Sequence, residues 1–236
     1  MSHTEPQSLT VHAVDATPFG SLSDSLIARG DHALFGVSTG NSYFSRRRLT
    51  EALSWALVRF EAVDVVHADL YLDAMCEALG YGPEDARRSA AKQVRGVRRR
   101  IQGALEDIGG AATRVRARPL SAFVEQPAYQ DVLGRARAAL GTDTELRAVR
   151  DEMAHRFLSA RLGPGVPPTG DQVRTAQAYI DAELPFFLDT PAILGVASSV
   201  HCYHSVLALG RLLFGDRATG LRPADTQGYA VVACQN

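Results

Sequence analysis

The sequence predicts an α/β fold in which helices cover a mostly parallel sheet. Residues 33–37 form a short apolar run, typical of a strand that is covered on both faces. Apolar residues then recur at spacings of three and four between Leu49 and Phe60, which predicts a helix with one buried face. Residues 63–66 form a second β-branched run. A strand, a helix and a strand in succession favour a parallel pair joined by a right-handed crossover.

The length and composition are those of one globular domain. The chain has 236 residues, of which 46% are hydrophobic and 22% charged, so it is long enough to bury a sizeable core. No repeat, low-complexity segment or linker divides it. We therefore expect a polar lead-in over residues 1–20 and a single catalytic domain over residues 21–236.

Cysteine usage and hydropathy favour a cytoplasmic protein. Three cysteines lie far apart, which suits a reducing compartment better than a disulfide framework, and they have no metal-ligand spacing. The first residues lack a basic region followed by an apolar run, and no apolar stretch approaches the length of a membrane span. We expect no metal and no membrane contact.

Proline and glycine residues that begin or end elements, and the spacing of apolar residues, predict the rest of the secondary structure. Pro83 begins a long helix that ends at Gly109-Gly110. Residues 113–120 alternate apolar residues with arginines, as expected of a half-exposed strand. Further on we expect helices over 127–140 and 143–161, a loop over 163–170, a helix over 172–184 capped by Asp171, a strand over 192–196, a helix over 201–214 and a last strand over 229–234.

A serine stands between two glycines directly after the first predicted strand. Open α/β sheets place their chemistry at the carboxyl ends of strands, so Ser38 is the candidate nucleophile. Gly36-x-Ser38-x-Gly40 also matches the elbow of serine hydrolases, with His201 or His204 downstream as a base. In that elbow the helix follows at once, whereas here Asn41 to Ser45 intervene. A purely structural turn is the other interpretation.

The long predicted helix carries a stripe of positive charge. Four residues spaced by four, three and four share one exposed face, with Arg98 beside them: Arg88, Lys92, Arg95 and Arg99. Like charges on one stripe destabilise a helix, which favours a polyanionic partner. The alternative is an ordinary solvated helix face. No aromatic residue interleaves the stripe, so nucleic acid would be contacted through its phosphates.

Two further groups of polar residues could carry chemistry. Tyr179 and Glu183, four residues apart on one helix, can face the same cavity, where the carboxylate can hold an ammonium group or transfer a proton. The segment 198–204 contains two serines, a cysteine, a tyrosine and two histidines. The alternatives are a surface glutamate beside a core tyrosine, and structural histidines.

Together these motifs resemble the cyclodipeptide synthases. The resemblance rests on the run from Gly36 to Ser45, on Tyr179 with Glu183, and on Ser199-Val200-His201-Cys202-Tyr203-His204, and extends from about residue 26 to 232. It implies a Rossmann-like fold similar to the catalytic domains of class I tyrosyl- and tryptophanyl-tRNA synthetases. It implies two aminoacyl-tRNAs as substrates, with no ATP and no cofactor. The chain has no phosphate-binding loop motif, consistent with that expectation.

The resemblance also implies a role for each motif residue. Ser38 would form aminoacyl- and dipeptidyl-enzyme intermediates in a ping-pong reaction. Asn41, Tyr179 and Glu183 would hold the α-amino group, and Glu183 would also transfer a proton. Tyr203 would lie beside the ester and His204 would support it; with Asn41 this trio defines one branch of the family. Tyr129 resembles a further active-site tyrosine. Some relatives carry an acid where this chain has Val206.

Side-chain selection is expected to involve two pockets. By similarity the first includes Leu34, Gly36, Leu120, Met153 and Phe186, and the second Val66 and His201. We expect a small or apolar first residue and a polar or acidic second one. The arginine stripe would hold the tRNA of the first substrate. The protein is expected to be a monomer whose cyclic product can pass to tailoring enzymes.

Two other functions are compatible with the residues alone. A serine esterase would use Ser38 with a downstream histidine and turn over simple esters without tRNA. A non-catalytic RNA-binding module would depend on Arg95 and Arg99 and not on Ser38.

Overall fold

The computed structural model describes residues 14–216 and 220–234. Six strands form one sheet in the order β1-β6-β5-β2-β3-β4. Only β1 is antiparallel, to β6, and the other neighbours pair in parallel. The strands are β1 (Val14–Pro18), β2 (His32–Val37), β3 (Ala62–His67), β4 (Val115–Pro119), β5 (Ser199–Tyr203) and β6 (Gln227–Cys234). The predicted α/β class with a mostly parallel sheet is confirmed.

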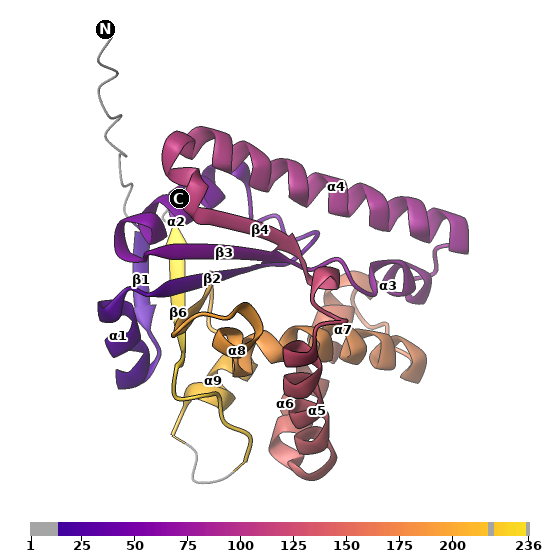
Figure 1. Cartoon of the computed structure of the whole chain (residues 1–236). Coiled ribbons are helices and arrows are strands. Elements are labelled where there is room, and N and C mark those ends of the chain that lie inside the picture. The colour runs from indigo at the N-terminus through magenta and orange to yellow at the C-terminus, as the bar shows by residue number, and fades with distance from the viewer. Residues whose placement is uncertain (1–13, 217–219, 235–236) are drawn as a thin grey trace, which may run out of the picture.

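Helices cover both faces of the sheet (Figure 1). The helices are α1 (Gly20–Arg29), α2 (Arg46–Arg59), α3 (Leu72–Ala78), α4 (Pro83–Ile108), α5 (Pro127–Thr142), α6 (Thr144–Leu162), α7 (Gly170–Leu188), α8 (Thr190–Leu194) and α9 (Ala208–Phe214), with 3-10 turns at Gly109–Arg114 and Leu120–Ala122. No helix of the described segments is long and apolar enough to cross a membrane.

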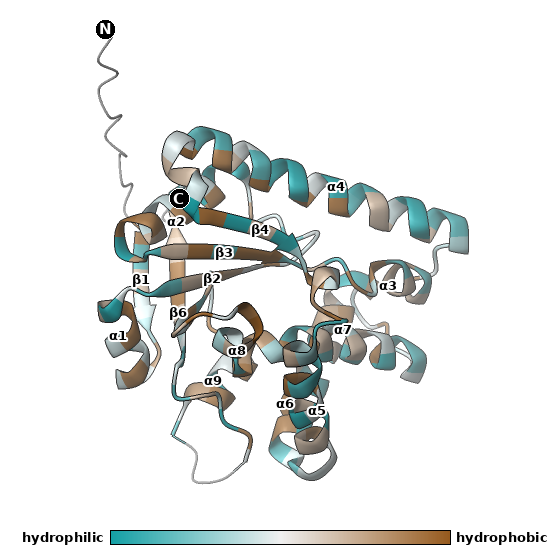
Figure 2. Cartoon of the chain, in the orientation of Figure 1, coloured by the Kyte–Doolittle hydropathy of each residue, from teal (hydrophilic) through white to brown (hydrophobic). Residues whose placement is uncertain are grey.

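Two apolar cores result from this layering. One packs α2 and the second half of α4 on the sheet and contains Trp55, Val97 and Ile101. The other packs α5, α6, α7 and α9 on the opposite face and contains Phe123, Leu158 and Phe186. Figure 2 shows hydrophobic residues along β3, whereas α4 alternates hydrophobic and hydrophilic residues. This contrast is expected of a covered parallel strand and an amphipathic surface helix.

Most predicted elements are present at close to the predicted bounds. The helix beginning at Pro83 ends at Ile108, where Gly109 adopts a positive φ of 70°. The helices and loop between residues 127 and 170 also form as predicted. α7 extends beyond the predicted end at residue 184, because Pro185 lies within the helix and does not terminate it. Thr169, and not Asp171, caps it by accepting from the Gln172 backbone.

Three predictions at the ends of the chain are wrong. Residues 192–196 form no strand, because Asp189 caps a short helix that starts at Thr190. Residues 201–203 belong to β5, so the predicted helix 201–214 is confined to α9; its apolar spacing ran across two elements. The irregular lead-in is in fact a strand over residues 14–18, at the sheet edge, and residues 1–13 lie outside the described part.

Candidate active site

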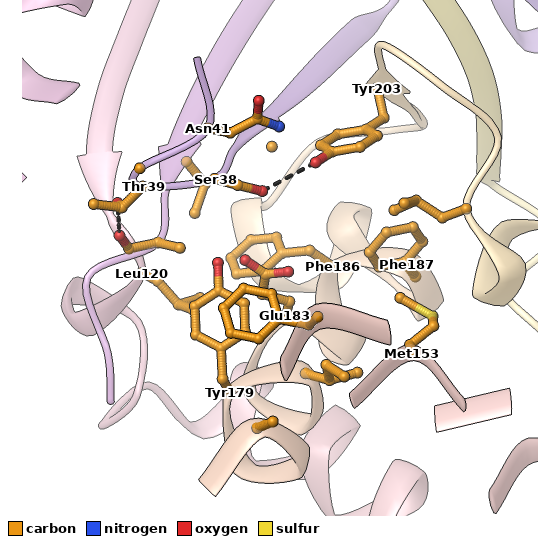
Figure 3. Close-up of a pocket in the computed structure, with 18 of the residues that line it drawn as sticks. Ser38, Thr39, Asn41, Leu120, Met153, Tyr179, Glu183, Phe186, Phe187 and Tyr203 are labelled. Carbon is orange, nitrogen blue, oxygen red and sulfur yellow. Dashed lines mark hydrogen bonds between the residues drawn. The ribbon is translucent and has the colours of Figure 1, made fainter. Parts of the chain in front are cut away.

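The candidate nucleophile lies at a reversal of strand order. β2, β3 and β4 succeed one another on one side of the sheet, whereas the chain returns to place β5 and β6 on the other side of β2. Ser38 follows the last residue of β2, and Tyr203 ends β5. Open α/β sheets bind their ligands in the crevice at the carboxyl ends of the strands at such a point. Figure 3 shows both side chains turned toward one cavity.

The turn that displays Ser38 is held on both sides. The Thr39 hydroxyl donates to the carbonyl oxygen of Ala68, just beyond β3. Gly40 has a φ of +80°, and a Cβ there would meet Gln93 Oε1 of α4 at 2.9 Å. The positive φ favours glycine, and a side chain at this position would also displace the Gln93 amide. The hydroxyl of Ser38 is therefore presented by a rigid turn.

Ser38 and Tyr203 share a hydrogen bond. Ser38 Oγ lies 3.0 Å from the Tyr203 hydroxyl, and either group can donate. Burial raises the pKa of Tyr203, against the opposing effect of the bond to Ser38. The phenol therefore keeps its proton at neutral pH and is able to exchange it with the serine.

His204 and Asn41 lie behind this pair. The rings of Tyr203 and His204 are 4.5 Å apart between centroids, and His204 stacks on Tyr43 at 4.0 Å. Asn41 Nδ2 donates to His204 Nε2 at 3.2 Å, while its Oδ1 accepts from the Tyr43 backbone at 2.9 Å. The structure thus brings the Asn41, Tyr203 and His204 trio together, with His204 against the tyrosine ring.

Helix α7 presents Tyr179 and Glu183 on the opposite wall (Figure 3). Burial raises the pKa of Glu183 to about 7, although a hydrogen bond from Tyr179 lowers it. Burial, and then the Glu183 carboxylate, raise the pKa of Tyr179 well above its usual value. A carboxyl group with a pKa near neutrality is suited both to hold an ammonium group and to transfer a proton.

These groups open into a cavity of about 450 Å³. All seven residues predicted for the two side-chain pockets line it: Leu34, Gly36, Val66, Leu120, Met153, Phe186 and His201. His201 lies against Gly36 and Phe186, residues that were predicted for the first pocket. The structure therefore places it beside first-pocket residues. Tyr129 is not a lining residue; its hydroxyl donates to Ala182 O at 2.8 Å, one layer behind the wall.

Sequence reasoning missed several other lining residues. Phe157 of α6 stacks on Tyr179 at 6.0 Å between centroids, and the Arg161 guanidinium lies 3.5 Å from the Phe157 centroid. Phe187, Ile180 and Leu207 complete the apolar wall. Helical period identifies such residues as members of a buried face. It does not distinguish a face that packs on a core from one that borders a cavity.

The predicted basic stripe lies along the first and middle turns of α4, whose first half projects past the carboxyl ends of the strands (Figure 1). All its members are exposed. Arg88 pairs with Asp85, whereas Lys92, Arg95 and Arg99 have no ion-pair partner in the described part of the chain. Arg98 differs, because its Nε donates to His67 Nε2 at 3.1 Å and its guanidinium lies 4.0 Å from Asp69.

Comparison with known proteins identifies the family. The family model described as cyclodipeptide synthase matches residues 14–234. The chain belongs to the cyclodipeptide synthase family. Its relatives are enzymes named for the cyclic dipeptides that they make.

Two curated cyclodipeptide synthases illustrate the similarity. The chain is 43% identical to the cyclo(L-tyrosyl-L-tyrosyl) synthase of Mycobacterium tuberculosis over 91% of its own length and 74% of the relative's. It is 38% identical to the cyclo(L-leucyl-L-phenylalanyl) synthase of Streptomyces noursei, over 95% and 93% of the two chains.

Solved structures of cyclodipeptide synthases also match this chain. A crystal structure of a cyclo(L-leucyl-L-phenylalanyl) synthase superposes with a TM-score of 0.88 at 37% identity, covering 95% of this chain and all of that one. A Mycobacterium tuberculosis structure matches with a TM-score of 0.84 at 38% identity, covering 100% of this chain and 99% of that one. It is described as demonstrating that cyclodipeptide synthetases are related to type I tRNA synthetases. The Rossmann-like fold implied by the resemblance is thus confirmed.

This cyclodipeptide synthase also contains a serine-histidine-aspartate arrangement outside the cavity, and its role is structural. His32 Nδ1 lies 2.8 Å from Ser199 Oγ, and its Nε2 lies 3.0 Å from Asp64 Oδ2. All three side chains are at most 1% exposed, at the amino-terminal half of the strands. Substrate cannot reach this serine. The hydrogen bonds of this arrangement instead satisfy buried polar groups across β5, β2 and β3.

The esterase interpretation lacks its base. Ser38 Oγ is hydrogen-bonded to Tyr203, and within the described segments no imidazole is bonded to it. The esterase considered from the sequence would need His201 or His204 in contact with the nucleophile. The RNA-binding interpretation accounts for the stripe but not for the cavity.

Proposed function

We propose that the protein makes a cyclic dipeptide from two aminoacyl-tRNAs, by covalent catalysis on Ser38. The observation that carries this proposal is the convergence of the Ser38–Tyr203 bond and the Tyr179–Glu183 pair on one cavity. Family membership supplies the product class. A more distant cyclodipeptide synthase, from Candidatus Glomeribacter gigasporarum, is described bound to Phe-tRNA(Phe), and that chain shares the fold at a TM-score of 0.53 and 14% identity.

In the first half-reaction Ser38 Oγ attacks the ester carbonyl of the first aminoacyl-tRNA. The bond from the carbonyl to the ribose oxygen breaks, and the serine proton passes through the Tyr203 hydroxyl to that oxygen. One ester replaces another, so the step needs little driving force and no ATP. Positioning then governs the rate, and well-held reactants can contribute about 7–11 kcal/mol. Glu183 in its carboxylate form holds the α-ammonium group.

In the second half-reaction the α-amine of the second aminoacyl-tRNA attacks the Ser38 ester. Glu183 accepts the proton that the attacking ammonium group must lose first. The bond from the acyl carbon to Ser38 Oγ then breaks, the second proton of the amine passes through Tyr203 to that oxygen, and the new amide leaves a dipeptide on the second tRNA. Ser38 then takes this dipeptidyl group and releases that tRNA. The free amine attacks the dipeptidyl ester, which closes the six-membered ring and restores the serine hydroxyl.

The stripe on α4 is proposed to hold the first tRNA. Lys92, Arg95 and Arg99 are exposed on α4, whose Gln93 lies against Gly40 and whose Arg98 bonds to His67 at the carboxyl end of β3. Phosphates of an acceptor stem can lie along them while the 3′ end enters the cavity. We further propose a monomer, no cofactor and tailoring enzymes that consume the product.

The test is product formation. The purified protein is incubated with a full set of charged tRNAs without ATP, and extracts are searched by mass spectrometry for cyclic dipeptides. We expect a product that the Ser38→Ala variant does not make. Product formed from free amino acids with ATP, or no product from any charged tRNA, would contradict the proposal.

A further inference from the structure

His201 is held rigidly in the floor of the cavity. It precedes Tyr203 by two residues on β5, so the two side chains lie on the same face of the strand. Its ring stacks on Phe187 at 4.2 Å between centroids, and its Nδ1 lies 3.2 Å from the carbonyl oxygen of Phe186. With only 4% of the residue exposed, the ring has one orientation.

These contacts decide which ring nitrogen carries the proton. A carbonyl oxygen only accepts, so Nδ1 must donate to Phe186. Burial lowers the pKa of His201 to about 4, and the imidazole is therefore neutral under physiological conditions. Nε2 is left with a lone pair and acts only as an acceptor.

Gly36 keeps this acceptor uncovered. A Cβ at residue 36 would lie 3.0 Å from His201 Nε2, so any other residue would cover the nitrogen. No described residue donates to Nε2, and Leu34 and Phe187 beside the His201 ring are apolar. An acceptor in an apolar wall costs free energy unless something donates to it.

The acceptor lies within reach of an acyl group on Ser38. Gly36 lies on β2 two residues before Ser38, which follows the end of that strand, and Leu34 is in register with His201. The step from Ser38 to Gly36 covers about 7 Å along the strand. A long side chain pointing down this wall reaches Nε2, whereas serine or threonine side chains are too short.

We propose that His201 Nε2 selects the first amino acid, by accepting a hydrogen bond from the far end of the side chain carried on Ser38. This inference rests on the proposed function. The substrate class is an aminoacyl group with an apolar body and a terminal donor, for which tyrosyl is the fit. An aliphatic side chain leaves Nε2 unpaired, and a carboxylate would face its lone pair. This substrate class differs from the small or apolar first residue expected from the sequence.

The experiment compares tyrosyl and phenylalanyl groups, which differ by one hydroxyl. Both are loaded on the same tRNA body, and the rate of acylation of Ser38 is followed by intact mass. We expect the wild-type protein to favour tyrosyl at least tenfold in kcat/KM, since sites that bond a substrate hydroxyl reject its deoxy analogue. His201→Phe keeps an aromatic ring without the acceptor, and should reduce the ratio to about one or below.

A second variant protects the test against misfolding. Gly36→Ala leaves the histidine in place but covers Nε2, and should also reduce the preference for tyrosyl. Equal acylation of the wild-type protein by the two groups, or a tyrosyl preference that persists in both variants, would overturn the inference while leaving the proposed function intact. Absence of any adduct with every charged tRNA would overturn the proposed function, and this inference with it.

Discussion

The hydroxyl groups of Ser38 and Tyr203 lie 3.0 Å apart although 165 residues separate them in the sequence. The pair forms because β2 and β5 are neighbours, with Phe35 in register with Cys202, so that both strands end at the same edge. The hydroxyl of the candidate nucleophile consequently lies beside the Tyr203 phenol, whose pKa is raised by burial, and it also interacts with the Tyr179 hydroxyl of α7. The predictions below start from this pair.

Removing the Tyr203 hydroxyl should slow acylation without unfolding the protein. Tyr203→Phe keeps the ring beside His204 but removes the hydroxyl that lies 3.0 Å from Ser38 Oγ. We expect a loss on the order of 10²-fold in the rate of adduct formation, in the range for positioned proton transfer. Tyr81→Phe, at a half-exposed tyrosine outside the cavity, is the matched control. Equal rates for the two variants would remove Tyr203 from the mechanism.

Glu183 should give the reaction a pH dependence. Its pKa is raised by burial to about 7, so in the free enzyme the carboxylate that holds an ammonium group forms as the pH rises through that value. We predict that kcat/KM for acylation increases between pH 6 and 8. The inflection should vanish in Glu183→Gln, together with at least about a tenfold loss of rate.

Ionisation of Glu183 should lower the stability of the fold as pH rises, over the range in which it raises activity. An acid with a folded-state pKa above its unfolded value of 4.5 stabilises the fold only while it is protonated, and this contribution is lost as pH rises toward 7. Glu183→Gln cannot ionise. Its melting temperature relative to wild type should therefore rise from pH 5 to pH 8, and a constant difference would contradict the buried-carboxyl assignment.

The exposed stripe should control salt dependence. Arg95→Ala and Arg99→Ala each remove one proposed phosphate contact. Each should lower affinity for tRNA and reduce the slope of log K against log salt by about 1. Arg29→Ala is the control, since that exposed arginine lies at the amino end of β2 and pairs with Asp31. An unchanged slope in both stripe variants would place the tRNA elsewhere.

Arg98 should behave differently from its neighbours. Its contacts with His67 and Asp69 tie α4 to the carboxyl end of β3, so Arg98→Ala should cost stability as well as affinity. We expect a loss of about 1–2 kcal/mol in the free energy of unfolding. Arg95→Ala should lose none. Denaturant unfolding of both variants distinguishes a bridging residue from a free cation.

The elements recognised from sequence are those with a strong local signal. Pro83 and Gly109 mark the ends of α4, and the run before Ser38 reads as a covered strand because β2 has a helical layer on each side. β1 is an edge strand with alternating half-buried residues, so its apolar signal is weak. Residues 201–203 became a strand through pairing with β2 and β6, which no local pattern encodes.

Sequence motifs predicted which residues form the site. They did not predict the roles of residues whose function depends on contacts between distant elements. Ser38, Tyr203 and Glu183 follow from their motifs. That Arg98 is bridged while Arg95 is free depends on where His67 ends β3. The open acceptor of His201 depends on the carbonyl of Phe186 and on the absence of a side chain at Gly36, relations among three separate elements.

Intact-mass measurement after mixing with a single charged tRNA tests the central claim most directly. With only one aminoacyl-tRNA species present and the reaction quenched early, the protein should gain the mass of one aminoacyl group. Fragmentation should locate the adduct on Ser38, and Ser38→Ala should remain unmodified. Cyclic dipeptide made at the wild-type rate by Ser38→Ala, or an adduct on any other residue, would contradict the account.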